Sequence, residues 1–446
     1  MRLRTFKRGI HPPDSKTTSK KETGIFLPPA GTTFVYPMVQ HLGAPCEPIV
    51  EIGQKVEVGD KIGDSAAYVS SPVFSAVSGK VTAIREAMTS TGRRSNAVII
   101  ESDGLYTDSP RINKPIEYWN MSKQDVLAAV REAGIVGLGG AGFPTHVKLN
   151  TPPDKKIDTI FINAAECEPY LTNDHRVLLE ETEKVLLGAG VLLHIFPDAK
   201  CFVAIERNKA DAMEKLMKMD KDPRISVMPL QTKYPQGAEK QIIAAGAGRE
   251  VPSGGLPMDV GCIVQNVDTV IAFHRAFYRG RPLMRKIVTV AGNAANNPGN
   301  YKVRLGMLYQ DMIDAFGGLR EKPYKIVMGG PMMGIAHYNL NIPVIKTSSA
   351  VLLFTEKECK SFEERACIRC GKCVDHCPMG LVPLDLDQFA RHRQHDKFEK
   401  FSGLDCMECA CCSYSCPSKR HLAQSISFAR RDIMAMKAAK RAAAGP

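Results

Sequence analysis

The sequence predicts a multidomain α/β protein, and three patterns along its 446 residues lead to that fold class. Short β-rich runs separated by turn residues fill 39–118, and strands alternate with helices across 119–282. Two cysteine-rich runs lie within 355–446. We therefore expect an extended arm over 1–38, a β domain, an α/β domain, a further small domain over 283–354 and a cysteine-rich domain.

The first 118 residues predict an arm followed by a small β barrel. Residues 1–38 are rich in Pro, Lys and Thr and have no hydrophobic period, which indicates extended chain. The turns V-x-x-G-D and S-x-V-S-G-x-V that follow resemble those of lipoyl-like barrel-sandwich domains. Such domains carry a modified lysine on a central hairpin, but 64–69 contains none. We expect an unmodified domain with a structural or docking role.

The segment 119–282 predicts a mostly parallel sheet covered on both faces. Apolar residues recur at helical spacing over 123–133, and DTIFIN at 158–163 predicts a buried strand. Further elements alternate in type: helix 176–196, strand 200–205, helix 208–217 and strand 225–230. This alternation is typical of a Rossmann-like domain, whose ligands bind beyond the carboxyl ends of the strands.

The last two domains are predicted because the regular alternation of strands and helices ends near 283. KIVTVAG, YKVRLGM, a helix near 308–316 and KIVMGGPMMG indicate a small β-grasp-like domain of the SLBB type over 283–354. From 355 onward we expect short helices wrapped around inorganic clusters, with a frayed end at MKAAKRAAAGP.

The cysteine-rich domain contains the pattern C-x2-C-x2-C-x3-C-P twice, which is typical of bacterial two-cluster ferredoxins. Three cysteines of each run fit one [4Fe-4S] cluster, and the fourth reaches the other cluster. One predicted ligand set is Cys367, Cys370, Cys373 and Cys416, and the other is Cys406, Cys409, Cys412 and Cys377. A pair of structural zinc sites is the disfavoured alternative. Cys411 is predicted to be a packing thiol, and substitution as a cluster ligand is its alternative.

The charge of +12 is concentrated at the two ends of the chain. It fits docking to anionic lipid or acidic proteins, and solvated tails are an equal alternative. No module interleaves basic and aromatic residues, so we expect no nucleic-acid partner. No run of eighteen apolar residues and no secretory signal are present, so we expect at most peripheral membrane contact.

A glycine-rich segment, GIVGLGGAGFPTHVKLN at 134–150, is the candidate phosphate loop. Glycines let a backbone lie flat against a ligand, and successive N–H groups can then cradle a phosphate or pyrophosphate. Lys148 follows and could neutralise that charge. A tight turn is the alternative, because the loop does not fit G-x-G-x-x-G.

The longer string GLGGAGFPTHVK resembles the flavin loop of the NADH-binding flavoprotein subunit of respiratory complex I. Three more strings follow in the same order as in that family: NAAECEP at 163–169, YPQGAE at 234–239 and QNVDT at 265–269. The resemblance implies a non-covalent FMN and an NAD(H) site.

That resemblance also implies roles for particular residues. The phosphates and NADH would be held by Gly137, Gly139, Gly140, Gly142 and Lys148. Asn163, Asn266 and Thr269 would bind the flavin, and Tyr234 and Gly237 belong to the same site. Glu166, Glu168 and Glu239 would face the nicotinamide or the ribityl chain. Glu166, Glu168 and Lys148 are the catalytic candidates. For Glu166 and Glu168, capping a helix N-terminus is the alternative.

This chain departs from the complex I pattern at Leu138, His146, Leu149, Ala165 and Ala238. These departures bear on adenine and ribose contacts, and so on the preference for NADH or NADPH.

Taken over its whole length, the sequence resembles the C subunit of the Rnf electron-transport complex. The strings that carry this resemblance include GIHPPDSK, GGAGFPTHVK, YPQGAEKQ, GGPMMG and CIRCGKCVDHCP. It implies a peripheral protein on the cytoplasmic face of the plasma membrane. This protein would pass electrons between NAD(H), FMN and two [4Fe-4S] clusters, and on to membrane and iron-sulfur partner subunits that connect it indirectly to ferredoxin. The alternatives are a soluble reductase of the cobalamin-reductase type and an electron-carrying adaptor with a vestigial nucleotide site.

Overall fold

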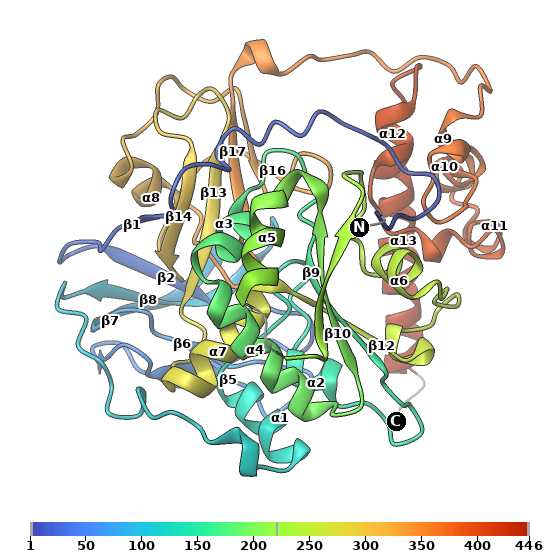
Figure 1. Ribbon diagram of the computed structural model, residues 1–446. Coiled ribbons are helices and arrows are strands. Elements are labelled where there is room, and N and C mark those ends of the chain that lie inside the picture. Colours follow the sequence, from blue (N-terminus) through green and yellow to red (C-terminus); the bar gives the residue numbers. More distant parts are fainter. Residues whose placement is uncertain (1–2, 220–221, 444–446) are drawn as a thin grey trace.

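The structure is a computed structural model that describes residues 3–219 and 222–443. Figure 1 shows the helical C-terminal part (orange to red) beside the green α/β domain, with the blue β domain on the other side. The predicted fold class is confirmed, because the chain combines a β sandwich, a parallel sheet, a mixed sheet and a helical domain.

The N-terminal β domain is a sandwich of two small sheets. The first sheet has the order β2 (Thr33–Pro37), β8 (Arg94–Ser102), β7 (Gly79–Met88) and β4 (Lys55–Val56). The second comprises β3 (Glu47–Pro48), β5 (Lys61–Asp64) and β6 (Val73–Phe74). Alternate residues of paired strands β2 and β8, such as Tyr36 and Val98, join the main core, and the intervening Val35 and Ile99 belong to a smaller buried cluster, since successive side chains of a strand point to opposite faces.

The α/β domain is built on a four-stranded sheet in which every neighbouring pair is parallel. Alternate side chains of β9 point to opposite faces: Ile160 and Ile162 join the main core, whereas Phe161 packs with Ile242 of α6. The sheet order is β11 (Ile225–Leu230), β10 (Lys200–Glu206), β9 (Thr159–Ala164) and β12 (Cys262–Asn266). Its helices are α1 (Lys123–Glu132), α2 (Thr145–Leu149), α3 (Asn173–Glu180), α4 (Thr182–Ile195), α5 (Ala210–Met219), α6 (Glu239–Ala247) and α7 (Val267–Arg279).

One predicted helix is wrong in its extent. The segment 176–196 was expected to be continuous, but α3 ends before Glu181 and α4 begins after it. Glu181 leaves helical geometry, and its buried carboxylate lies 2.5 Å from Lys302 and 3.4 Å from Arg275. The hydrophobic period of the sequence could not predict these ion pairs of Glu181, because their partners lie far away along the chain.

The third domain is a mixed sheet to which the arm contributes a strand. Residues 24–25, predicted as part of an extended arm, form β1 and pair with β14. The sheet order is β1 (Gly24–Ile25), β14 (Gly299–Arg304), β13 (Arg285–Ala291), β17 (Ala350–Phe354), β15 (Lys325–Met328) and β16 (Ile335–His337), and α8 (Tyr309–Ala315) packs beside it.

The C-terminal domain contains one long helix in addition to the expected short ones. α13 (Leu422–Ala443) extends through most of the end that was predicted to fray; residues 444–446 lie outside the described residues. Its Ile426, Ala429 and Ile433 recur at helical spacing and pack with Leu386 of α10, which gives the helix a tertiary anchor. The short helices are α9 (Lys372–Asp375), α10 (Pro383–Arg391), α11 (His395–Lys400) and α12 (Cys411–Ser415).

The basic ends of the chain are not simply solvated tails. Figure 1 shows the dark-blue arm running from the helical domain across the α/β domain to β1. Lys16 is buried within this path, and Arg430 and Lys437 of α13 form ion pairs with Glu408 and Glu399. Backbone pairing with the α/β domain holds the arm in this position.

Candidate functional site

The predicted flavin residues gather at the carboxyl edge of the parallel sheet. Asn163 and Asn266 lie at the ends of neighbouring strands β9 and β12, and their Cα atoms are register partners. The loop after β11 contributes Tyr234 and Gly237, and the glycine-rich loop reaches the same edge beside Asn266. Ligands of open α/β sheets bind at this edge.

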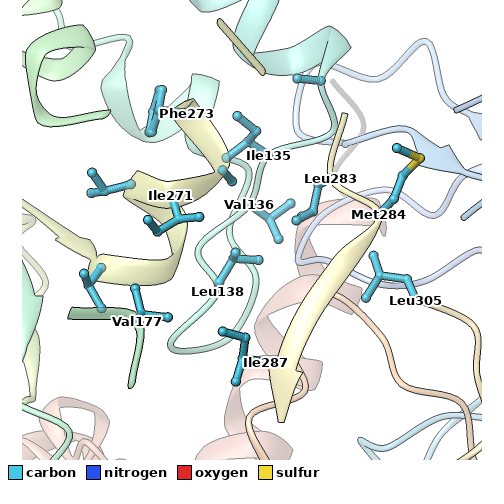
Figure 2. Packing of buried hydrophobic residues seen from close by; sticks show 14 of the residues in the cluster. Ile135, Val136, Leu138, Val177, Ile271, Phe273, Leu283, Met284, Ile287 and Leu305 are labelled. Carbon is cyan, nitrogen blue, oxygen red and sulfur yellow. The ribbon is translucent and has the colours of Figure 1, made fainter. Parts of the chain in front are cut away.

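The glycine-rich loop is anchored on both sides, which leaves its tip free to approach a ligand. Ile135, Val136 and Leu138 point into the core between Ile271 of α7 and Ile287 of β13 (Figure 2). Gly137 N–H donates to the Phe143 carbonyl at 3.0 Å and closes the loop.

Glycine is required at two positions of this loop for different reasons. Gly139 has no space for a side chain, because an added Cβ would lie 2.6 Å from the Asn266 amide nitrogen. Gly142 adopts a φ of +73°, which favours glycine. Gly140 is exposed and faces open space, so the tip presents bare backbone.

Asn266 and Thr269 hold the loop in place from below. Thr269 is fully buried, and its hydroxyl accepts a hydrogen bond of 3.0 Å from Leu138 N–H. Asn266 caps α7 by accepting from Asp268 N–H at 2.9 Å, and it donates to Asp174 Oδ2 at 2.8 Å. Both side chains therefore bond to protein groups that position the loop, rather than pointing to open space where a flavin could bind.

Asn163, Gly237, Lys148 and Glu239 link the remaining loops of the site. Asn163 donates to the Gly237 carbonyl at 2.8 Å, which fixes the loop after β11 against the end of β9. Lys148 of α2 and Glu239 at the start of α6 form a half-exposed ion pair of 2.5 Å. The pair places one positive and one negative group within reach of solvent, beside the edge where a phosphate would bind.

Glu166 lies in the protein interior. Its carboxylate accepts a 2.6 Å hydrogen bond from Asp174 N–H in the first turn of α3, and its second oxygen lies 3.9 Å from both Lys16 and Lys209. Burial raises the pKa of this carboxyl, and the two lysines oppose the effect. These contacts match the helix-capping alternative. Only 2% of the side chain is exposed to solvent, so little of it is open to a ligand.

Glu168 connects the site to the SLBB-like domain. Its two carboxylate oxygens accept hydrogen bonds of 3.1 Å from the backbone N–H groups of Met332 and Met333. Gly330 makes this approach possible, because an added Cβ would lie 2.2 Å from the carboxylate. Burial raises the pKa of Glu168 to about 7, and the two backbone donors lower it in part.

The eight predicted cluster cysteines line two separate cavities. The first contains Cys367, Cys370, Cys373 and Cys416, with apolar walls from Leu384 and Leu422. The second contains Cys377, Cys406, Cys409 and Cys412, and Cys411 also lines it. In both cavities three cysteines of one run meet the last cysteine of the other run, which is the exchange that the spacing predicted.

The thiols surround cavities and do not converge on a point. No three His, Cys, Asp or Glu side chains within 3–219 and 222–443 are placed to hold a single metal ion. The donor set around each cavity is four sulfurs with apolar surroundings, which suits an iron-sulfur core.

Tyr234 joins the α/β domain to the second cysteine cavity. The residue is 1% exposed, and its hydroxyl donates to the Cys409 carbonyl at 2.9 Å. The same hydroxyl lies 3.5 Å from Glu168 Oε1. Ile10 and Cys411 pack with Tyr234 in one small apolar cluster, so Cys411 does have packing contacts.

Several residues of the site were not identified as functional from the sequence. Lys16, Lys209 and Asp174 surround Glu166, and buried Lys286 pairs with Asp268 below the glycine loop at 2.6 Å. Burial and the neighbouring Glu166 raise the pKa of Asp174 to about 7. For Lys16 a signal existed, since it ends the string GIHPPDSK. The others lie in ordinary helix and strand patterns.

Comparison with known protein families agrees with this architecture domain by domain. Residues 4–105 match the RnfC barrel sandwich hybrid domain, and 130–275 match the Nuo51 FMN-binding domain. Residues 287–336 match the SLBB domain, and 366–419 match a 4Fe-4S dicluster domain. The combination defines a flavin and iron-sulfur electron-transfer protein.

Two curated relatives align with almost the whole chain. The C subunit of the Na(+)-translocating ferredoxin:NAD(+) oxidoreductase complex of Acetobacterium woodii is 45% identical over 97% of this chain and 98% of its own length. The proton-translocating counterpart of Clostridium ljungdahlii is 42% identical over 96% of this chain and 94% of its own. This chain belongs to that family, the C subunits of ferredoxin:NAD+ oxidoreductase complexes. The family predicted from the sequence is confirmed over the cobalamin-reductase alternative.

Two solved structures align with most of this chain. NAD+-reducing [NiFe]-hydrogenase in the H2-reduced state aligns with a TM-score of 0.47 and 19% identity, over 72% of this chain and 63% of that one. The air-oxidized state gives a TM-score of 0.47 and 20% identity, over 70% and 61%. Separately, none of the helices in the described part of the chain has the length and apolar character needed to span a bilayer.

Proposed function

We propose that this chain exchanges electrons between NAD(H) and a non-covalent FMN, and conducts them through two [4Fe-4S] clusters to partner subunits of an Rnf-type complex. The main support is the hydrogen bond from the Tyr234 hydroxyl to the Cys409 carbonyl. It fastens the loop beside the glycine-rich edge directly to the backbone of Cys409, with 2.9 Å between the joined oxygens. Electron transfer between the two centres requires such close and rigid placement.

The residues at the sheet edge fit a flavin phosphate and a dinucleotide. Gly139, Gly140 and Ala141 expose their backbone at the loop tip, and Gly140 has open space in front of it. Lys148 supplies a positive charge nearby. Bound FMN would supply the conversion between a two-electron hydride exchange and single-electron transfer.

The protein side chains then have positioning and electrostatic tasks. Thr269 and Asn266 hold the glycine loop, and Lys148 neutralises phosphate charge in competition with Glu239. Glu168, with its pKa raised to about 7, is able to hold or release a proton near neutral pH at its carboxylate.

The two cysteine cavities fit two cubane clusters in a defined order. The cavity of Cys406, Cys409 and Cys412 is the one joined to Tyr234, so its cluster would lie nearer the flavin. The cavity that contains Cys367 and Cys370 has these two residues exposed, so its cluster would exchange electrons with a partner. We further propose that the protein is peripheral and sits on the cytoplasmic face of the plasma membrane.

Anaerobic reconstitution tests the flavin entry site. The chain is loaded with FMN and iron-sulfide, NADH is added, and the flavin absorption band is followed. Rapid bleaching is expected. Lys148→Ala should weaken FMN or NADH binding about 10- to 100-fold, because a charge-assisted hydrogen bond contributes about 1.5–3 kcal/mol. Lys155→Ala is the matched control, since Lys155 forms a similar exposed ion pair, with Asp259 at 3.1 Å.

Intact clusters without bleaching would reject the dehydrogenase proposal and favour an electron-carrying adaptor. Cluster assignment has its own test, iron content and electron paramagnetic resonance of two serine variants. Cys416→Ser should perturb the cluster held by the first cysteine run, and Cys377→Ser the cluster held by the second. If each variant perturbed the cluster of its own run, the proposed ligand exchange would be excluded.

A further inference from the structure

The N-terminal arm places a lysine under the electron-transfer site. Arg4 pairs with the backbone of β11 and the following loop, and Ile10 exchanges two backbone hydrogen bonds with Tyr234, of 2.8 and 2.9 Å. Gly9 N–H donates to the His376 carbonyl of the cluster domain. The arm therefore contacts both domains before it reaches Lys16.

The Lys16 ammonium group occupies a ring of backbone carbonyls. It donates to the carbonyl oxygens of Glu166 at 2.9 Å, Glu168 at 3.0 Å and Leu171 at 2.5 Å. An ammonium has three donors and no acceptor, so its hydrogen-bonding capacity is fully used. The side chain is 8% exposed, and the Glu166 carboxylate lies 3.9 Å from the ammonium group. Burial and the nearby Lys209 lower the pKa of Lys16, whereas Glu166 and Glu206 raise it.

The turn held by Lys16 has a conformation that needs support. Glu166 and Tyr170 have φ values of +51° and +70°, in the left-handed region that residues with a Cβ seldom adopt. Such geometry persists where the surrounding contacts over-determine it. A single cation that gathers three carbonyls within this turn provides those contacts.

We propose that Lys16 is a positioning residue of the electron-transfer site: it fixes the 166–171 turn and thereby places the Glu168 carboxylate beside Tyr234, whose hydroxyl contacts the second cysteine cavity. The backbone carbonyl of Glu168 is one of the three Lys16 acceptors, while its side chain is held by Met332 and Met333 and lies beside Tyr234. Lys16 thus acts through Glu168, without contact with a substrate. This inference rests on the proposed function.

The test uses the full chain loaded with FMN and both clusters, and compares Lys16→Met with Lys20→Met. Met keeps the length of the side chain but removes charge and donors. Lys20 is exposed in the same arm and serves as the matched control. Amide hydrogen exchange of 166–171 is measured first, before NADH is added. Lys16→Met should accelerate exchange about tenfold or more, because three hydrogen bonds are lost, and Lys20→Met should not.

Stopped-flow mixing with NADH then separates flavin bleaching from cluster reduction. Lys16→Met should slow cluster reduction on the order of 10- to 100-fold relative to bleaching, since small displacements cost this much at a reacting site. Glu168→Gln should slow the same step by itself. The double variant should be no slower than the slower single variant, because both changes act through one carboxylate.

Three results would overturn the proposal: wild-type exchange in Lys16→Met, wild-type cluster reduction in Glu168→Gln, or multiplicative losses in the double variant. If Lys16→Met fails to fold, Lys16→Arg, which keeps the charge but not the shape of the ammonium group, replaces it in both measurements, and Glu168→Gln tests the carboxylate alone because it leaves the carbonyl ring around Lys16 intact. Absence of bleaching in wild type would instead reject the proposed function. The exchange measurement would still decide whether Lys16 holds the turn.

Discussion

Removal of one partner from the buried ion pair between Lys286 and Asp268 should strongly destabilise the α/β domain. Lys286 is on β13 and Asp268 is in the first turn of α7, so the pair ties two domains together below the glycine loop. Their side chains are 1% and 2% exposed, and their charged atoms lie 2.6 Å apart. The perturbation is Lys286→Met, which keeps most of the apolar volume and removes the charge.

The magnitude follows from what the substitution leaves behind. Asp268 would lose its charged partner in a buried site, where removal of one partner of an ion pair costs about 3–5 kcal/mol. One of its oxygens, Oδ1, has no hydrogen-bond partner among the described residues, so no alternative donor is in place. The double variant with Asp268→Asn should recover much of this loss, because neither remaining group is charged.

Native-state hydrogen exchange measures the effect without assuming that a multidomain protein unfolds in one step. The free energy of opening should fall for amides of β13 and α7. Arg94→Met is the control, since its ion pair with Glu86 is 4.0 Å long and exposed, and no measurable change is expected. A loss below about 1 kcal/mol in Lys286→Met, or no recovery in the double variant, would refute the reasoning.

Three further predictions concern the site. Tyr234→Phe should destabilise the contact with the cluster domain by about 1–3 kcal/mol, because the Cys409 carbonyl loses its donor. Urea unfolding followed by cluster absorbance measures this loss, and an unchanged unfolding midpoint would contradict the prediction. Glu168 has a pKa raised from 4.5 to about 7, so its contribution to stability is present below about pH 4.5 and is lost as pH rises through about 7. The stability of wild type relative to Glu168→Gln should therefore fall between about pH 4.5 and pH 7, and a difference that stays constant with pH would refute this prediction. Gly139→Ala should destabilise the α/β domain by about 1–3 kcal/mol, because the new methyl group would clash with Asn266, which caps α7. Gly140→Ala is the control: its position faces open space, so thermal unfolding should be unchanged.

The site could be predicted in part from local patterns. The strings at 134–150, 163–169, 234–239 and 265–269 carry residue types whose chemistry suits a phosphate-binding edge. The role of a side chain within that edge was harder to infer. Asn266 and Thr269 turn toward the framework, and Glu166 turns toward α3, because a helix N-terminus and buried donors compete for the same polar atoms.

The arm and the C-terminal helix illustrate the limits of periodicity. Residues 1–38 have no hydrophobic period, yet the arm pairs with β11 and Tyr234 because backbone hydrogen bonds do not require one. The chain from 436 onward was expected to fray, but up to Ala443 it continues α13, whose Ile426 and Ile433 pack against α10. Tertiary packing supplies most of the stability of a helix, and the partner surface is not visible in the helix's own sequence.

The sequence by itself determined the family, the domain order and the pairing of the two cysteine runs, because these depend on spacing along the chain. Only the tertiary structure decided which cavity adjoins the flavin-type edge, through Tyr234 and Cys409, and that Lys16 reaches the 166–171 turn. These contacts join residues separated by 175 and 150 positions. Local spacing does not determine such contacts, since they depend on how whole domains pack.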